Sequence, residues 1–190
     1  MKISKKYEAV VASNKENFKK ILLGGHIVEI VDASEYESSN GTELMKFTFD
    51  VIEDGEFNHY FESDAHFDKE GNIVWPNGGT KYILPENSEL LKQLVNSINS
   101  SNEDQVVVTG GEDLDFQQFC GKQLCCQFGL EEYYNNSGEV KAGLCIKGFY
   151  PIADLDSIEV PLVKLIDGNE IPYEEYKKNK AKRKERKWKN

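Results

Sequence analysis

Histidines and paired carboxylates are the side chains of this sequence that could carry out acid-base or metal chemistry. His66 follows Asp64 in the string Ser-Asp-Ala-His, and on a strand this spacing would place both side chains on one face, as a metal site requires. In a polar loop the same string is only solvated. The acidic pairs Glu53-Asp54 and Glu131-Glu132 have no histidine or lysine close by in sequence for proton transfer. We therefore predict that this protein is not an enzyme and that it has no catalytic residues, metal ligands or cofactor.

The cysteines could suggest a zinc site or disulfides. They are Cys120, Cys125, Cys126 and Cys145. Cys125 and Cys126 are adjacent within a strand-like pattern, so their side chains point to opposite faces and cannot both join one tetrahedral site without distortion. We interpret all four as reduced cysteines acting as small apolar residues, with a zinc site and a disulfide as the alternatives.

Charge is distributed unevenly along the 190 residues. Residues 1–20 carry a net charge of +4, residues 21–176 carry −22 and residues 177–190 carry +8. A terminal block of like charge is usually a solvated, disordered tail that attracts polyanions. This tail also contains Trp188, whose indole can stack on a base while neighbouring cations neutralise phosphates. The tail therefore indicates nucleic-acid binding, with a merely solubilising tail as the alternative.

The hydrophobic pattern predicts a β-rich fold with one clear helix. Met45 and Phe47 alternate with Lys46 and Thr48, which is typical of a half-buried strand. Asn-Gly and Asp-Gly pairs after the first two strands mark reversals of the chain. The predicted elements are strands at 26–33, 44–51, 57–61, 124–130 and 142–146, a short extended piece at 81–84, a helix at 87–100 and a helical turn within 113–119.

Three strands, a helix and two more strands is the element order of an OB-fold, a barrel that binds oligonucleotides or oligosaccharides. We therefore predict a mainly β, five-stranded OB-fold barrel with the helix between strands 3 and 4, a decorating loop at 62–80 and a disordered basic C-terminal tail. A four- or five-stranded α+β sheet of another topology is the alternative. The expected organisation is an N-terminal extension at 1–20, an OB-fold domain at 21–166 and a C-terminal segment with the basic tail at 167–190.

No stretch of the sequence approaches the roughly 20 apolar residues that a membrane helix needs. Residues 1–20 also lack the uninterrupted apolar core of a signal peptide. We expect no membrane contact and a cytoplasmic location.

Strand alternation indicates which side chains could contact nucleic acid. If Phe47 faces the core, Lys46 faces outward; if Ile146 faces the core, Lys147 and Phe149 face outward. Aromatic side chains near strand ends or loops could stack on bases, or could instead pack against the core. The expected contacts are Lys46, Tyr60, Trp75, Lys81, Tyr82, Tyr133, Lys141, Lys147, Phe149, Lys182, Arg183, Lys184, Arg186 and Trp188.

Several segments, in this order, resemble a family of bacteriophage-encoded proteins. They are LLGGHIVEIVDASE, LMKFTFDVIEDGEFNHYF, LKQLVNSINSSN, GKQLCCQFGLEEYYNNSGEVKAGLCIKGFYPIADL and VPLVKL, within about residues 20–166. The most specific parts are Gly24-Gly25, residues 50–61, and Gly121-Lys122 leading into 129–133. Members are encoded among phage replication and recombination genes and are described as single-stranded DNA-binding proteins with an OB-fold. The resemblance implies single-stranded DNA binding without sequence preference, with phage or host replication and recombination proteins as candidate partners, and is compatible with an oligomer.

The charge pattern departs from that of many bacterial single-stranded DNA-binding proteins. Those proteins end in an acidic tail that recruits partners, whereas this chain ends in a basic one. Phosphate neutralisation supplies most of the affinity for nucleic acid, so the few cations of residues 21–176 would have to gather on one face. The acidic body supports an alternative of another class, an acidic protein-binding module or nucleic-acid mimic that inhibits a host DNA-binding protein.

Overall fold

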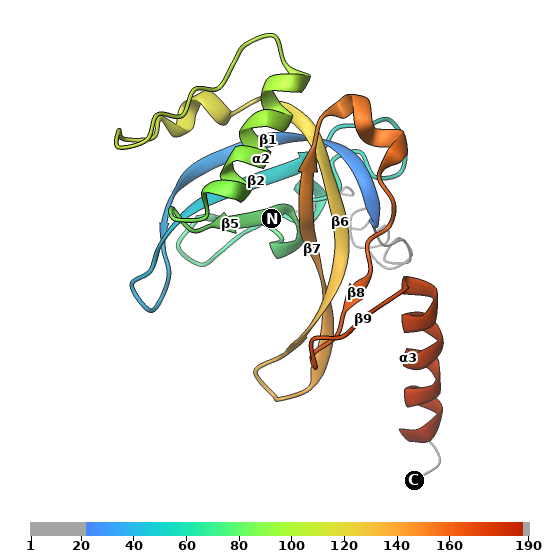
Figure 1. The fold of residues 1–190 in the computed structure, drawn as a ribbon. Helices are drawn as coiled ribbons and strands as arrows, with labels where there is room; N and C mark the ends of the chain where they lie inside the picture. Colours follow the sequence, from blue (N-terminus) through green and yellow to red (C-terminus); the bar gives the residue numbers. More distant parts are fainter. Residues whose placement is uncertain (1–21, 188–190) are drawn as a thin grey trace, which may run out of the picture.

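The computed structural model describes residues 22–187, and its largest element is a seven-stranded mixed sheet (Figure 1). The strands are β1 (Gly24–Glu37), β2 (Glu43–Val51), β5 (Thr80–Ile83), β6 (Gln123–Tyr134), β7 (Val140–Tyr150), β8 (Val163–Lys164) and β9 (Glu170–Ile171). They follow in the order β5-β2-β1-β6-β8-β9, and β7 pairs with β6. The pairing of β6 with β8 is parallel, which makes the sheet mixed.

The sheet curves, but it does not close into a barrel. Pairing of β5 with β7 would close a five-stranded barrel, and the described residues contain no ladder between these strands. Instead, the ammonium group of Lys81 on β5 donates a hydrogen bond of 2.9 Å to the carbonyl oxygen of Ile146 on β7. The predicted mainly β class is therefore confirmed, whereas the closed five-stranded barrel is not observed.

The β1–β2 hairpin follows the predicted pattern. Every second residue of β2 from Met45 to Val51 is buried in the main core, and Lys46 lies on the opposite face. Gly41 in the β1–β2 turn and Gly55 after β2 have φ angles of 79° and 121°, which explains the glycine of each predicted Asn-Gly and Asp-Gly turn. Local sequence signals therefore determine this part of the sheet.

The predicted third strand at 57–61 is wrong, because this segment forms turns. Asp50 near the end of β2 accepts hydrogen bonds from the backbone N–H groups of Phe61 and Glu62, which fixes a turn where a ladder was expected. His59 has a φ of 53°, a left-handed conformation that does not occur in a regular strand. The third long-range strand is instead β5, from the segment predicted as a short extended piece.

Helix α2 (Ser88–Ser101) confirms the predicted helix and packs on the sheet (Figure 1). The side chain of Asn87 accepts a hydrogen bond from the backbone N–H of Leu90, so it caps the first turn. Leu94 and Ile98, one helical turn apart, are fully buried in the main core. The helix thus covers the apolar face of the curved sheet. In the chain it lies between β5 and β6.

Shorter elements complete the body. The β3 (His66–Phe67) and β4 (Ile73–Val74) strands form a separate two-stranded hairpin within the predicted decorating loop. The 3-10 helices are η1 (Glu62–Asp64), η2 (Asn77–Gly79), η3 (Phe116–Phe119) and η4 (Ile152–Ser157), and η3 confirms the predicted helical turn. Among residues 22–187, no helix has the length and apolarity needed to cross a membrane.

The C-terminal segment is folded where the sequence predicted disorder. Residues Tyr173–Lys187 form helix α3, and Tyr176 packs against Leu130 and Val163 in a small second core. Glu174 and Glu175 lie in the first turn of α3, where negative charge favours the helix dipole. The basic block from Lys177 to Lys187 is thus carried on a helix attached to the sheet.

Candidate nucleic-acid interface

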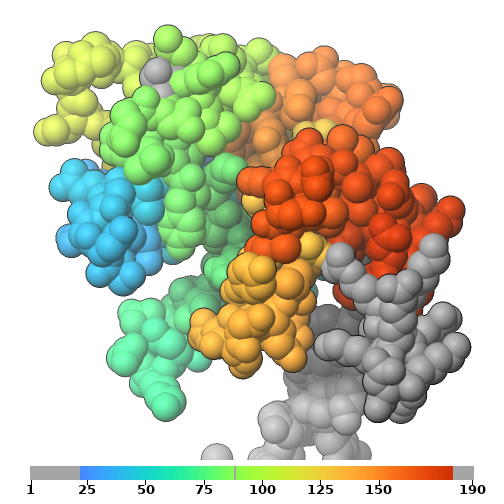
Figure 2. All heavy atoms as spheres, turned by 60° about the horizontal axis from the view of Figure 1, so that its bottom comes forward, coloured from blue at the N-terminus to red at the C-terminus, as the bar shows by residue number. Residues whose placement is uncertain are grey.

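The described residues form a groove between the tip of the β6–β7 hairpin and helix α3. Figure 2 shows the end of this hairpin (gold) as a lobe beside the C-terminal segments (red). The groove has a volume of about 930 Å³. Its lining includes Tyr133, Asn135 and Lys141 from the hairpin and Tyr176, Asn179 and Lys180 from α3. We call this cavity the hairpin–helix groove.

Helix α3 brings positive charge to one wall of this groove. Tyr176 anchors the helix, and the ammonium of Lys180 lies 6.0 Å from the centroid of the Tyr176 ring. Lys177 is 4.9 Å from the centroid of Tyr173 and forms a 2.6 Å ion pair with Glu174. The ring contacts hold these lysine stems against the anchored end of the helix, so the position of the first cations follows from the packing of the two tyrosines.

The hairpin supplies an aromatic ring on the opposite wall. Tyr133 is 48% exposed, and a methyl group at Gly143 would lie only 3.1 Å from the ring, so the ring lies closely over this glycine. Lys141 is directly opposite Tyr133 in the β6–β7 ladder and forms a 2.9 Å ion pair with Glu139. The arrangement places an exposed aromatic surface next to an exposed cation, which suits stacking on a base beside a phosphate.

The hairpin turn is fixed by one side chain. The carboxamide oxygen of Asn135 accepts hydrogen bonds from the backbone N–H groups of Ser137 and Glu139, at 3.0 and 2.8 Å. Gly138 has a φ of 73°, which the turn requires. This local order keeps Tyr133 and Lys141 in register at the mouth of the groove.

A second exposed face unites two of the predicted residues with one that the sequence analysis missed. Lys46 on β2 lies opposite Tyr82 on β5, and Tyr36 on β1 contacts Tyr82 with ring centroids 4.9 Å apart. Partial burial, and then the neighbouring Tyr36, raises the pKa of Tyr82. Tyr36 was missed because the predicted first strand ended at residue 33, whereas β1 continues to Glu37.

Lys81 and Lys147 are less exposed to solvent than the prediction of outward-facing lysines implied. Lys81 spans the gap between β5 and β7 through its bond to Ile146, and burial lowers the pKa of its ammonium group. Lys147 is 3.4 Å from the carboxylate of Glu131, which also pairs with Lys164 at 2.9 Å. Both lysines therefore have structural partners at the open edge of the sheet.

The outward orientation predicted for Phe149 is wrong. Phe149 is 1% exposed and contacts Phe49 in the main core, with ring centroids 5.7 Å apart. The cause is an irregularity in the β6–β7 ladder, where Gln127 pairs with Gly148 but Phe128 pairs with Ile146. Lys147 is the extra residue of this bulge, so alternation reverses after it and both Ile146 and Phe149 face the core.

Trp75 and Tyr60 are half-buried and take part in packing. The indole N–H of Trp75 donates a 3.0 Å hydrogen bond to the carbonyl oxygen of Phe49, beyond the point where β5 stops pairing with β2. Tyr60 contacts Phe57 and Phe61 edge to face, and burial raises the pKa of its hydroxyl. The sequence left open whether these aromatic rings stack on bases or pack against the core. For both residues, packing against the core accounts for the contacts.

The remaining predicted contacts belong to the basic tail. The residues that fall within the helical backbone of α3 are Lys182, Arg183, Lys184 and Arg186. Trp188 lies outside the described residues.

All four cysteines are free thiols, as the favoured interpretation predicted. Cys125 and Cys126 are both fully buried, and burial raises the pKa of Cys125 to about 12. Burial also raises the pKa of Cys145. Thiols held protonated in this way are poor nucleophiles and poor metal ligands.

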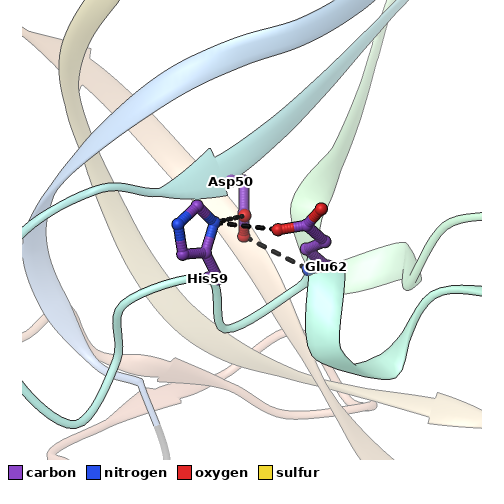
Figure 3. Close-up of side chains that lie close together, drawn as sticks. All are labelled: Asp50, His59 and Glu62. Atoms are coloured by element: carbon purple, nitrogen blue, oxygen red, sulfur yellow. Dashed lines mark hydrogen bonds and ion pairs between the residues drawn. The ribbon is translucent and has the colours of Figure 1, made fainter.

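One group of side chains could hold a metal ion, and sequence reasoning missed it. Asp50, His59 and Glu62 converge at the end of β2, and their ligand atoms all lie within 4.8 Å of one another (Figure 3). Nδ1 of His59 is 3.0 Å from Oδ2 of Asp50 and 2.9 Å from Oε2 of Glu62. The sequence signal was confined to the spacing of three between His59 and Glu62, because Asp50 joins them only through the turn.

Comparison with protein-family models and with curated proteins finds no match for this chain.

Proposed function

We propose that this protein binds single-stranded DNA without sequence preference, as a phage protein of replication or recombination. The observation that carries the proposal is the hairpin–helix groove, where Tyr133 and Lys141 of one hairpin face Lys180 of α3. Single strands are bound by stacking bases on aromatic rings along a cationic groove. This groove offers the ring of Tyr133 with Lys141 and Lys180, and its lining also includes Glu132 and Glu139.

The position of helix α3 also bears on the difficulty posed by the acidic body. Residues 21–176 carry a net charge of −22, which opposes binding of phosphates. Helix α3 adds the cations that the body lacks, and Tyr176 fixes their point of entry at the groove. In this mechanism the cations of α3 attract the phosphate backbone, and Tyr133 selects unpaired bases because only these expose a face for stacking.

Strand order gives further support. The path β5-β2-β1-β6-β7, with α2 between β5 and β6, is the path of a partly open OB-fold barrel. The Lys81 to Ile146 bond marks the place where such a barrel would close. We infer an OB-like fold whose β2–β5 face, with Lys46, Tyr36 and Tyr82, provides a second area for contact with the strand.

The test is fluorescence anisotropy with labelled oligo-dT and a matched duplex at low salt. Oligo-dT longer than about 16 nucleotides covers the largest site size of one OB-fold. We expect micromolar or tighter binding of the single strand, weakening steeply between about 50 and 200 mM salt because counterion release drives it. Absence of binding at low salt would refute the proposal.

Matched variants locate the site. Tyr133→Ala should weaken single-strand binding about 5- to 150-fold, since one stacked base contributes about 1–3 kcal/mol. Tyr134→Ala is the control, because Tyr134 is the more exposed ring, at 62%, but does not line the groove. Lys141→Ala should reduce the slope of log affinity against log salt by about 0.7, and Lys69→Ala at the β3–β4 turn should not. Equal effects of each variant and its control would place the site elsewhere.

A second candidate function rests on another groove, of about 380 Å³, beside the β1–β2 turn. Glu35, Glu37 and Glu43 line it together with apolar side chains such as Met45 and Phe116. An acidic rim with an apolar floor suits a basic protein surface, as expected of a nucleic-acid mimic. Two results together would support this second function. The protein would bind no nucleic acid at low salt, and it would form a stoichiometric complex with a basic DNA-binding protein that added DNA displaces.

A further inference from the structure

The Asp50, His59 and Glu62 side chains have the donor set of a three-ligand zinc site, and their ligand atoms all lie within 4.8 Å of one another. Zn²⁺ accepts imidazole and carboxylate ligands, and sites with three protein ligands keep a fourth position for water. Bonds of about 2.0–2.1 Å at tetrahedral angles separate the ligand atoms by roughly 3.3 Å. The separations of 3.0 and 2.9 Å from Nδ1 of His59 are close to that value. We propose that Asp50, His59 and Glu62 bind a divalent transition-metal ion, preferentially Zn²⁺.

Asp50 divides its two oxygens between positioning and ligation. Oδ1 accepts hydrogen bonds of 3.0 and 3.3 Å from the backbone N–H groups of Phe61 and Glu62. Oδ2 points to the imidazole of His59 (Figure 3). The side chain of Asp50 is 5% exposed, so one ligand oxygen is held rigidly at the end of β2. The other two ligands come from the turn and from the first residue of η1, and a bound ion would tie this turn to the sheet.

The charge around the site favours a cation independently of the distances. Residues 50–64 contain six acidic residues and no lysine or arginine. Within the described part of the chain, the ion pairs of Asp50 and of Glu62 are with His59 alone. Two carboxylates that converge without a lysine or arginine repel each other, and an ion between them removes this repulsion.

The imidazole decides which class of ion fits. Mg²⁺ and Ca²⁺ take oxygen ligands, whereas imidazole suits zinc, copper and nickel. The side chains of His59 and Glu62 are 58% and 63% exposed, so an ion has a direct path from solvent and room for bound water. These features fit an exchangeable site on the surface.

The experiment is a titration of the metal-free full chain with ZnCl₂ in a calorimeter, with MgCl₂ and CaCl₂ in parallel and no nucleic acid present. We expect one Zn²⁺ per chain with micromolar or tighter affinity, Mg²⁺ and Ca²⁺ at least ten-fold weaker, and a higher melting temperature with Zn²⁺. The double variant His59→Asn with Glu62→Gln should bind Zn²⁺ more than about 100-fold more weakly. Asparagine tolerates the left-handed backbone at position 59, so the turn is kept.

The control is the double variant His66→Asn with Glu70→Gln, which alters an exposed histidine and an exposed glutamate of the β3–β4 hairpin. It should bind Zn²⁺ like the parent. Unchanged affinity of the His59 and Glu62 variant, no Zn²⁺ binding by the parent, or equal affinity for Mg²⁺ would each overturn the proposal. If that variant does not fold, Co²⁺ spectra of the parent decide: tetrahedral visible bands without a sulfur charge-transfer band support it, and a sulfur band or no visible bands overturns it.

Discussion

Replacing Tyr176 with alanine should release helix α3 from the sheet and leave the sheet folded. Tyr176 is 7% exposed and is the side chain of α3 that is buried in the second core. Removing a buried aromatic side chain costs about 3–5 kcal/mol. The 15 residues of α3 are at the length where an isolated helix is marginal in water, and its closely spaced cations repel one another. The helix therefore has little stability of its own with which to compensate.

The loss should stay local because the two cores differ in size. Among the described residues, the second core has three buried residues, whereas the main core has nineteen, including Leu94 and Ile98 of α2. Amide hydrogen exchange read by mass spectrometry separates the two. We expect exchange within 173–187 to become up to about 150-fold faster, the equivalent of about 3 kcal/mol, with exchange in α2 unchanged.

Tyr134→Ala is the control for this prediction. It removes an equally large but exposed ring at the end of β6. It should leave exchange in α3 unchanged. Unaltered protection of α3 in the Tyr176 variant would show that the helix is held by other contacts. An equal rise of exchange in α2 would show that the two cores unfold as one, and either result refutes the reasoning.

Two further predictions concern the β6 strand. Gly129→Ala should destabilise the protein by about 1–3 kcal/mol in chemical denaturation, since its methyl group would lie 2.7 Å from Pro161, whereas Gly110→Ala, with open space around it, should be nearly neutral. Glu131→Gln should lower stability at neutral pH by less than about 1 kcal/mol and reduce acid sensitivity. The hydrogen bond that Lys164 donates, and then the charge of Lys147, lower the pKa of Glu131 from its ordinary value of 4.5. The contribution of the Glu131 carboxylate to stability is therefore present above pH 4.5 and is lost as the pH falls through the lowered pKa. Identical acid denaturation of parent and variant would contradict the second prediction.

Local patterns in the sequence were sufficient where each residue's environment is set by its near neighbours. The alternation from Met45 to Val51 predicted the buried face of β2, and the spacing of Leu94 and Ile98 predicted that of α2. The Asn-Gly and Asp-Gly pairs predicted turns whose glycines have positive φ. In these cases one periodicity, or one steric requirement, decides the conformation.

The errors arise where a distant contact overrides the local pattern. Phe57 to Phe61 reads as an extended apolar run, yet the Asp50 carboxylate captures its backbone and turns it. One extra residue, Lys147, reverses the alternation that placed Phe149 outside. The basic block was expected to be disordered because it is a terminal block of like charge, but its helix depends on Tyr176, whose pocket is formed by strands more than ten residues away.

The candidate site shows the same division. The sequence predicted Tyr133 as an aromatic near a strand end or loop and Lys141 as an outward-facing cation, but nothing local indicated that α3 would form the opposite wall. That wall exists because Tyr176 fits between Leu130 and Val163, two side chains of the sheet. An acidic body and a basic C-terminus, read separately, give opposite expectations for nucleic-acid binding. Packed together by one tyrosine, they place cations next to an exposed ring, and this juxtaposition supports binding of a single strand more strongly than either feature does alone.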